Sequence, residues 1–346
     1  MVLNDSRHQV AILIPTKSRS AFVFRLINYY QSVKCPHPLY IGDASEPKHA
    51  SLIEAYISKI NITVRYFNWE NIGPNQTIVM LAQEALKDSV MYCAFHGDDD
   101  YFIPHSLFVA AQFLSNNPTY RTCQGRAALF TLDQPGAYGN LASVGDYWGV
   151  NELDQNSPIE RLKYFLDHYF VLQFSTHRTS EFIHSSEAYM RIQNDSVGEL
   201  MHCWTFAISG KSKFIDCLYL IRHSHPAATH LPMLDLLLKP TWSSDIETTK
   251  EALTNQLTSK AKISKEDAFK IVMDLLRRKI LGAVPSSNQK ILQRVIISLK
   301  KMFPSSTKSK VRLILVPANS LSILQNRKSI YYEQFKPVLD SMQSNV

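Results

Sequence analysis

Short apolar runs alternate with helix-type segments over the first 95 residues, and this alternation limits the possible folds more than any other feature of the sequence. Residues 9–15 read Gln-Val-Ala-Ile-Leu-Ile-Pro, a β-branched run typical of a strand buried on both faces of a parallel sheet. Three further strands are predicted at residues 38–43, 62–66 and 89–95, with helices between them at residues 22–33, 48–57 and 76–87. This series predicts a parallel sheet with helices on both faces.

Each of the four predicted strands is followed by a polar cluster. These clusters occupy residues 16–19, 43–46, 71–75 and 96–100. Ligands of open α/β sheets bind at the carboxyl ends of the strands. We therefore expect the four loops to form one binding rim.

Length and composition favour a globular protein. The chain has 346 residues, of which 45% are hydrophobic and 19% charged, so it can form one large α/β domain with an appendage or two domains. No run of eighteen apolar residues occurs, and no transmembrane helix is predicted. Five widely spaced cysteines without a Cys-x-x-Cys pair argue against a disulfide framework or a zinc knuckle, and we expect a cytoplasmic location.

The positive charge is concentrated toward the C-terminus. Residues 251–346 hold 17 Lys and Arg against 6 Asp and Glu, whereas the whole chain has a net charge of +7. We divide the chain at residues 1–235 and 236–346, and predict basic, mainly helical structure in the second part, with helices at 268–281 and 289–302. This part could meet anionic lipid, nucleic acid or an anionic acceptor, or it could be a solvated basic surface.

Three consecutive carboxylates, Asp98, Asp99 and Asp100, lie in the loop that follows the fourth predicted strand. Like charges so close together raise one another's pKa unless a cation or solvent compensates them. Carboxylate oxygens completed by phosphate and water suit Mg²⁺ or Mn²⁺. The alternative, a solvated acidic loop or an acidic helix N-terminus, remains open at this point.

Residues 92–107 resemble the strand, Asp-x-Asp signature and following helix of the GT-A glycosyltransferases, and within them the large inverting family two. That family opens with a strand that ends in Pro-Thr-x-x-Arg, which corresponds here to Pro15, Thr16 and Arg19. The match covers about the first 110 residues well and continues loosely to about residue 230. The resemblance implies a GT-A fold, a Rossmann-like and mostly parallel α/β sheet flanked by helices, here with a C-terminal helical extension.

The resemblance also implies how a nucleotide-sugar donor is bound. Asp43 corresponds to the family's base-reading Asp, and Asn71 and Gly73 match its Asn-x-Gly motif. Many relatives have an aromatic residue at the position of Lys17, so Lys17 instead approaches phosphate or caps its loop.

The Asp triplet corresponds to the family's metal-binding motif. Asp98 and Asp99 align with its acidic pair, so we expect Asp98 near the ribose, with Asp99 and Asp100 as rival ligands of Mn²⁺ or Mg²⁺. A C-terminal His is a further metal ligand in many GT-A enzymes. His225 is our candidate, with His223 as its competitor.

The general base of the family is an Asp or Glu that begins a helix about a hundred residues after the metal motif. Glu199 fits this place, before a predicted helix at 202–209 and a strand at 213–222. Asp195 and Glu187 are its nearest competitors, and an ordinary Glu near a helix N-terminus is the alternative. Arg222 could neutralise diphosphate charge or pair with an acid.

These features predict a metal-dependent inverting transferase that moves a sugar from a UDP-linked donor to a saccharide or lipid-linked acceptor, with peripheral membrane association through the basic region. Aromatic residues between 147 and 204 would suit an acceptor site but are more often core. A sugar nucleotidyltransferase is the first alternative, although residues 15–21 lack its Gly-rich loop. A non-catalytic scaffold with an anion-binding tail is the second. Nucleic acid is not expected, because Tyr331, Tyr332 and Phe335 lie beyond most of the basic residues.

Overall fold

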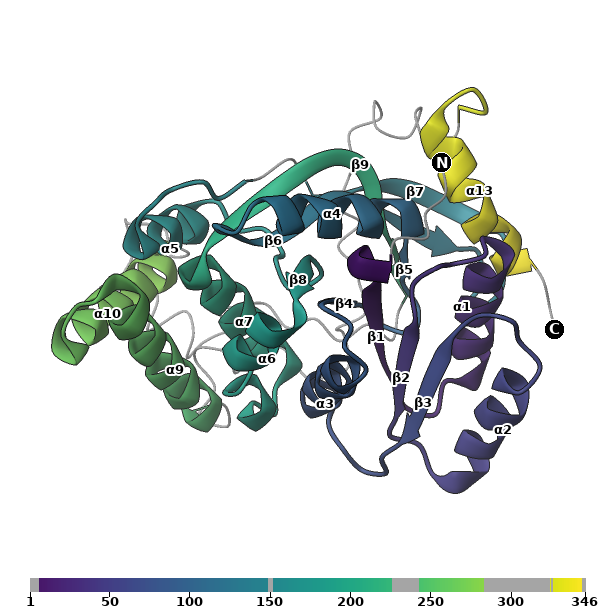
Figure 1. Cartoon of the computed structure of the whole chain (residues 1–346), viewed down its shortest axis with the longest axis horizontal. Coiled ribbons are helices and arrows are strands. Elements are labelled where there is room, and N and C mark those ends of the chain that lie inside the picture. The colour runs from purple at the N-terminus through teal and green to yellow at the C-terminus, as the bar shows by residue number, and fades with distance from the viewer. Residues whose placement is uncertain (1–5, 149–151, 226–242, 283–323, 325, 344–346) are drawn as a thin grey trace, which may run out of the picture.

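The structure is a computed structural model that describes residues 6–148, 152–225, 243–282, 324 and 326–343. Nine strands of this part form one sheet, and helices lie against both of its faces (Figure 1). In spatial order the strands are β3 (Val64–Asn68), β2 (Leu39–Asp43), β1 (Val10–Thr16), β4 (Tyr92–Phe95), β8 (Thr176–Arg178), β6 (Tyr120–Leu132), β9 (Lys211–His223) and β5 (Tyr101–Phe102), with β7 (Leu141–Trp148) pairing with β6.

The first half of the fold agrees with the alternation in the sequence. Strands β1, β2, β3 and β4 pair in parallel, and residues 10–14 of the central strand β1 are fully buried. Helices α1 (Ser20–Ser32) and α2 (Pro47–Ile57) lie on one face of these strands, and α3 (Pro74–Lys87) lies on the other (Figure 1). The four predicted strands and three predicted helices are all present, with ends that differ by a few residues.

The second half of the sheet is mixed, and the sequence predicted less of it. Helix α4 (Pro104–Asn116) and the long strands β6 and β9 follow the parallel part, and β8 pairs antiparallel with both β4 and β6. Residues 136–149 are rich in glycine, and the sequence predicts a connector there. This prediction is wrong in part, because β7 occupies most of the segment. Its first glycines do form a turn, with Gly136 and Gly139 at positive φ, and this turn returns the chain to pair with β6.

Helix α7 (Asp195–Ser209) begins earlier than predicted, so Glu199 lies in its second turn and not at its start. The Asn194 side chain caps the helix by accepting a hydrogen bond from the backbone N–H of Val197 at 3.0 Å. The sequence did not predict this helix start, because Gly198 lies in the first turns and glycine disfavours helix. A side chain at Gly198 would clash, since an added Cβ would lie 2.7 Å from Tyr189 and 2.9 Å from Asn75.

Helix α5 (Pro158–Asp167) is joined to the end of α7 by a buried arginine. The Arg161 guanidinium donates to the carbonyl oxygens of Ala207 and Ile208 at 2.9 and 2.8 Å, and to two carbonyl oxygens that precede α5. Carbonyl oxygens at a helix C-terminus otherwise lack donors. Burial lowers the pKa of Arg161 to about 10.

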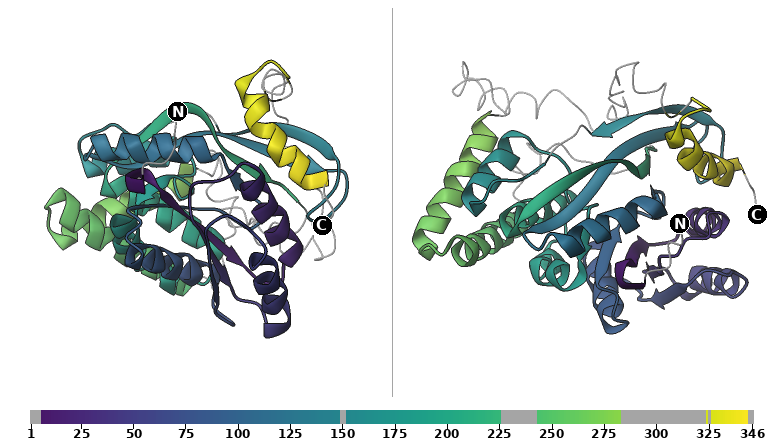
Figure 2. Two further views of the ribbon diagram at one scale, coloured as in Figure 1. Left: turned by 45° about the vertical axis from the view of Figure 1, so that its right-hand side comes forward. Right: turned by 45° about the horizontal axis from the view of Figure 1, so that its top comes forward.

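The described helices of the C-terminal region pack against the first 235 residues at two places. Helices α9 (Ser243–Ala261) and α10 (Lys265–Gly282) adjoin α5 and α7, whereas α13 (Ile330–Gln343) lies beside α1 (Figure 2). Phe335 and Val338 of α13 are fully buried. The predicted helix at 268–281 falls within α10, and the one predicted at 289–302 lies outside the described residues. The division at residue 235 stays a prediction.

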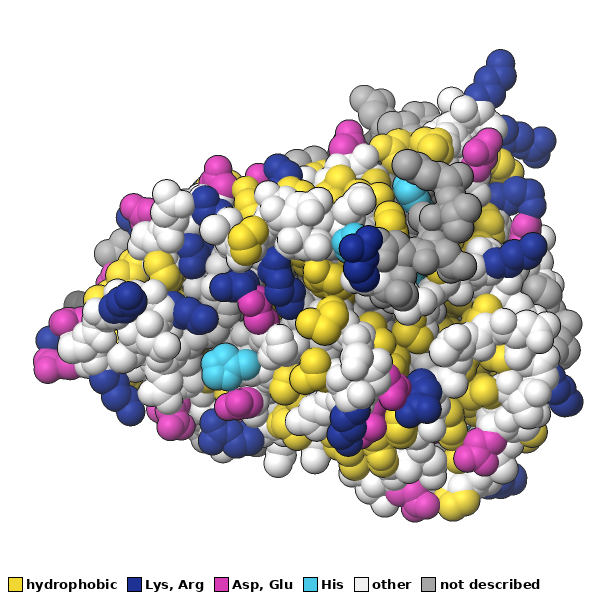
Figure 3. Space-filling view, viewed as in Figure 1, with side chains coloured by type: hydrophobic (Ala, Val, Ile, Leu, Met, Phe, Trp, Pro, Cys, Tyr) yellow, Lys and Arg dark blue, Asp and Glu magenta, His cyan; other side chains and the backbone are white. Residues whose placement is uncertain are grey.

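The surface mixes charges of both signs. On the face drawn in Figure 3, Lys and Arg side chains are interspersed with Asp and Glu, including over the α9 and α10 end. Among the described helices, none is both long and apolar enough to cross a bilayer.

Candidate active site

A cavity of about 300 Å³ opens at the carboxyl ends of β1 and β4 and is bounded across from them by α7. Eight residues that the sequence analysis singled out line it: Pro15, Arg19, Asp99, Asp100, Asp195, Glu199, Arg222 and His225. Pro15 and Arg222 lie near the ends of β1 and β9, and the others come from the loops after β1, β4 and β9 and from α7. The cavity therefore brings together segments that lie more than 200 residues apart.

Asp98 and Asp99 are both paired with Arg19. The Arg19 guanidinium lies 2.9 Å from Asp98 Oδ1 and 3.0 Å from Asp99 Oδ2. Thr16 Oγ1 also donates to Asp98 at 2.6 Å, and His225 Nε2 lies 2.7 Å from Asp99 Oδ2. Asp98 is buried behind the cavity, whereas Asp99 and His225 line it.

Asp100 is held by groups at the end of β9. Its carboxylate accepts from Arg222 Nε at 2.9 Å and from the backbone N–H of His223 at 3.0 Å. Both of its oxygens are thus engaged within the protein, and its exposed fraction is only 1%. Of the two rival metal ligands, Asp99 is therefore the more accessible.

The three carboxylates of the triplet have different pKa values. Burial raises the pKa of Asp98 to about 7, helped by the charge of Asp99. Burial likewise raises the pKa of Asp100 to about 6. Burial also acts to raise the pKa of Asp99, but the His225 hydrogen bond and the Arg19 charge outweigh it and hold that pKa below its usual value. Asp99 is the carboxylate of the three that stays ionised most readily.

Arg25, a residue of α1, binds the backbone of the triplet. Its side chain is fully buried and donates to the carbonyl oxygens of Asp99 at 2.9 Å and Ala137 at 2.6 Å. The guanidinium also lies over the rings of Phe22 and Tyr101, 5.0 and 5.3 Å from their centroids. Arg25 therefore fixes the backbone that carries Asp99.

Asp43, the predicted base-reading residue, belongs to a network that links the loops after β1 and β2. Its carboxylate accepts from the backbone N–H of Ser45 at 2.8 Å and from the Tyr66 hydroxyl at 2.7 Å. The Ser45 hydroxyl in turn accepts from the N–H of Ser18 at 2.6 Å. Asp43 is completely buried and does not line the cavity, so its role in reading a base stays a prediction.

Three other residues that were predicted to bind the nucleotide-sugar donor also do not line the cavity. Lys17 is exposed in the loop after β1, and Asn71 is exposed with a positive φ of 61° in the loop after β3. Gly73 precedes α3 as its N-cap residue. The structure instead brings the next two residues, Pro74 and Asn75, to the cavity wall.

Glu199 faces the cavity from α7 and is held by two neutral donors. The Tyr169 hydroxyl donates to its Oε1 at 2.9 Å, and Gln173 Nε2 donates to its Oε2 at 3.0 Å. Of its two competitors, Asp195 also lines this cavity, and burial raises its pKa. Glu187 does not line this cavity.

Gln173 and Tyr189 line the cavity without having been predicted, whereas Phe174 is among the aromatic residues for which the sequence leaves acceptor site and core as alternatives. Gln173 and Phe174 come from the segment before β8, and Tyr189 belongs to the short helix η2 (Tyr189–Arg191). The interpretation of the aromatic segment as core is correct for His177 and Trp204, which are buried. Phe174 does reach the cavity, and the Arg222 guanidinium lies 4.7 Å from its ring centroid.

Two side chains that could bind a divalent cation converge at the cavity wall. Asp99 and His225 meet at the cavity wall, and their contacting atoms are 2.7 Å apart. Within the described residues, no group of three His, Cys, Asp or Glu side chains is arranged to hold a metal. Mg²⁺ and similar ions are commonly held by one or two carboxylates plus substrate phosphates. The residues present thus fit a site completed by substrate, provided that Arg19 releases Asp99.

The fold resembles that of solved structures of S. aureus TarS. The crystal structure of TarS 1-349 in complex with UDP-GlcNAc matches over 96% of this chain and 89% of its own, with a TM-score of 0.51 and 13% identity. TarS 1-349 alone matches over the same shares with a TM-score of 0.49 and 13% identity.

A longer TarS chain matches over 78% of this chain, with a TM-score of 0.48 and 14% identity, and this chain spans 43% of its length. No protein-family model and no curated protein matches the sequence. At these identities the likeness concerns the fold, and the GT-A fold predicted from the sequence is confirmed.

Proposed function

We propose that this protein is a glycosyltransferase that moves a sugar from a UDP-linked donor to a saccharide or lipid-linked acceptor, with inversion at the anomeric carbon. The observation that carries the proposal is the composition of the cavity at the carboxyl ends of β1 and β4. We name the lining residues Arg19, Asp99, Asp100 and His225, which come from the loops after β1, β4 and β9, the donor wall. We name Asp195 and Glu199 of α7, together with Gln173, Phe174 and Tyr189, the acceptor wall.

The donor wall has the chemistry to bind a diphosphate. Arginine binds phosphate through several N–H groups at once, and Arg19 is a third exposed beside the cavity. Asp99 and His225 would hold a Mn²⁺ or Mg²⁺ ion. When bound, such an ion stabilises the negative charge that develops on a leaving nucleoside diphosphate.

The acceptor wall offers a positioned general base. In an inverting transfer the acceptor hydroxyl attacks the anomeric carbon as the bond to the diphosphate oxygen breaks. The base takes the hydroxyl proton, and the nucleoside diphosphate leaves with the bonding electrons. Glu199 suits this role because hydrogen bonds from Tyr169 and Gln173 fix its carboxylate toward the cavity.

The likeness to TarS supports the same class of donor. The matching TarS 1-349 structure with the TM-score of 0.51 is a complex with UDP-GlcNAc. The fold match extends over 96% of this chain. A UDP-sugar is therefore the first donor to test.

The acceptor and the cellular location belong to the proposal as well. Phe174 and Tyr189 lie beside Glu199 in the cavity, and aromatic rings pack well against sugar faces. The basic region beyond residue 250 would hold the enzyme at an anionic membrane carrying a lipid-linked acceptor. Cosedimentation with anionic vesicles at low but not at high salt checks this part, and no binding at low salt would remove it.

A donor assay tests the function directly. The protein is incubated with a panel of UDP-sugars, with and without Mn²⁺, and released UDP is measured. We expect Mn²⁺-stimulated release from at least one donor, and its loss in the Asp99→Ala, Glu199→Ala double variant. Pyrophosphate release from a nucleoside triphosphate and a sugar phosphate, without UDP release, would instead indicate a nucleotidyltransferase.

A further inference from the structure

A second cavity, of about 310 Å³, lies between α6 (Thr179–Ser185), α7 and α9. It shares no lining residue with the first cavity. Tyr189 and Glu199 line the first, whereas Arg191 and Thr205, from the same two elements, line the second. Its volume is within the range of small-molecule sites.

Two polar atoms on its walls are buried without a hydrogen-bond partner in the described part of the chain. One is the hydroxyl of Thr205, a residue that is only 4% exposed. The other is Gln256 Oε1, and the amide of the same side chain donates to Ser209 Oγ at 2.5 Å. Buried polar groups are normally paired, so these two atoms are available to a ligand.

The cavity also has a surplus of positive charge. Arg191 and Lys260 are exposed at its edge, and neither has an ion-pair partner among the residues that the structure describes. The acidic residue there, Glu187, lies 3.6 Å from the ring of His184. The lining residues thus combine two cations that lack an ion-pair partner in the described part of the chain with a buried hydroxyl and a buried amide oxygen that lack hydrogen-bond partners there.

We propose that this cavity binds an anionic saccharide unit. The Thr205 hydroxyl and the Gln256 amide oxygen would hydrogen bond to sugar hydroxyls, and Arg191 and Lys260 would bind the acidic group. A uronate carboxylate and a sugar phosphate share this chemistry. The inference does not depend on the proposed transfer reaction, because no residue of the first cavity takes part.

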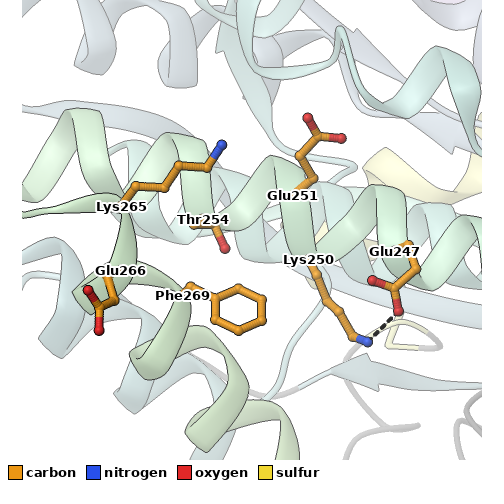
Figure 4. Close-up of a pocket in the computed structure, with 7 residues that line it drawn as sticks. All are labelled: Glu247, Lys250, Glu251, Thr254, Lys265, Glu266 and Phe269. Atoms are coloured by element: carbon orange, nitrogen blue, oxygen red, sulfur yellow. Dashed lines mark hydrogen bonds and ion pairs between the residues drawn. The ribbon is translucent and has the colours of Figure 1, made fainter.

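Another groove, along α9, does not have the positive charge that an anion-binding site requires. Figure 4 shows Phe269 at its centre, with Glu247, Glu251 and Glu266 around it. Lys250 is paired with Glu247 at 2.6 Å. Thr254 also has an unpartnered hydroxyl there, but the three carboxylates outnumber the two lysines of the lining, Lys250 and Lys265, and would repel an anion. We therefore place the anionic ligand in the cavity lined by Thr205.

Calorimetric titration of the full chain with four compounds tests the proposal: glucuronate, glucose 6-phosphate, glucose and inorganic phosphate. We expect one of the two acidic sugars to bind at least tenfold more tightly than glucose and than inorganic phosphate. Glucuronate and glucose 6-phosphate distinguish the carboxylate from the phosphate source. Saturating UDP should not displace the sugar.

Three variants locate the binding. Thr205→Val removes one hydrogen bond at nearly constant volume and should weaken binding about fivefold, with a melting temperature no lower than that of the wild type. Arg191→Ala with Lys260→Ala should weaken it at least tenfold, whereas Lys59→Ala, which removes an exposed cation in the turn after α2, should change nothing. Equal binding of glucose or inorganic phosphate, no binding of any compound, or insensitivity to Thr205→Val and the double variant would overturn the proposal. UDP binding in Thr205→Val serves as a separate readout of the first cavity.

Discussion

The two walls of the first cavity hold their carboxylates in different ways. On the donor wall, Asp99 and Asp100 are ion-paired with Arg19 and Arg222. On the acceptor wall, Glu199 accepts hydrogen bonds from the neutral side chains of Tyr169 and Gln173. An ion-paired carboxylate can exchange its arginine partner for a metal ion. The arginine that it releases can then bind phosphate. A carboxylate fixed by neutral donors is oriented while it retains lone pairs for a proton.

The largest expected effect is on the acceptor wall. Glu199→Gln keeps the shape of the side chain but removes the base, so we expect kcat to fall about 10³-fold, within the usual range for general base catalysis. The affinity for UDP should stay unchanged. Steady-state kinetics and UDP titration measure the two quantities.

Asp195→Asn is the matched control for that variant, because Asp195 is a carboxylate of the same helix and the same cavity. We expect it to lower kcat less than tenfold. If Asp195→Asn abolishes turnover and Glu199→Gln does not, the base has been assigned to the wrong residue.

On the donor wall the corresponding effect is on stability. Arg222→Met leaves the buried Asp100 without its ion-pair partner and should lower the free energy of unfolding by about 3 kcal/mol, because an unpaired buried charge is strongly unfavourable. Urea unfolding measures this loss. Adding Asp100→Asn to Arg222→Met should restore part of it, and a double variant less stable than either single variant would contradict the ion-pair account.

The stability of the sheet that carries the donor wall should depend on pH through His37. Burial lowers the pKa of His37 to about 4 from its usual 6.5, and its ring accepts from the N–H of Val10 in β1 at 3.1 Å. The unfolded chain binds the proton more tightly, so stability falls as pH falls from about 6.5 toward about 4. Between pH 7.5 and 5.5 we expect His37→Gln to lose about 1 kcal/mol less than the wild type. Equal losses would show that His37 does not contribute.

The sequence was most informative where contacts follow chain order. The strand before Pro15 and the strand before Asp98 are continuous apolar runs, so their ends, and with them Arg19 and Asp99, could be placed at one rim. The family resemblance added Glu199 and His225, and both line the cavity.

Side chains that depend on contacts between distant segments could not be placed in this way. Asp43 ends a strand as predicted, but Tyr66 and Ser45 bury its carboxylate, and no local pattern signals that. Gln173 and Phe174 reach the cavity because β8 inserts antiparallel between β4 and β6. A strand of three residues is too short to show periodicity.

Calorimetric titration of UDP, with and without Mn²⁺, into the wild type and the Asp99→Asn variant tests the central claim most directly. The account predicts that Mn²⁺ raises the affinity of the wild type for UDP at least tenfold, and that the variant loses this gain while remaining folded. Failure of UDP to bind the wild type with or without Mn²⁺, or an undiminished Mn²⁺ effect in the variant, would contradict it.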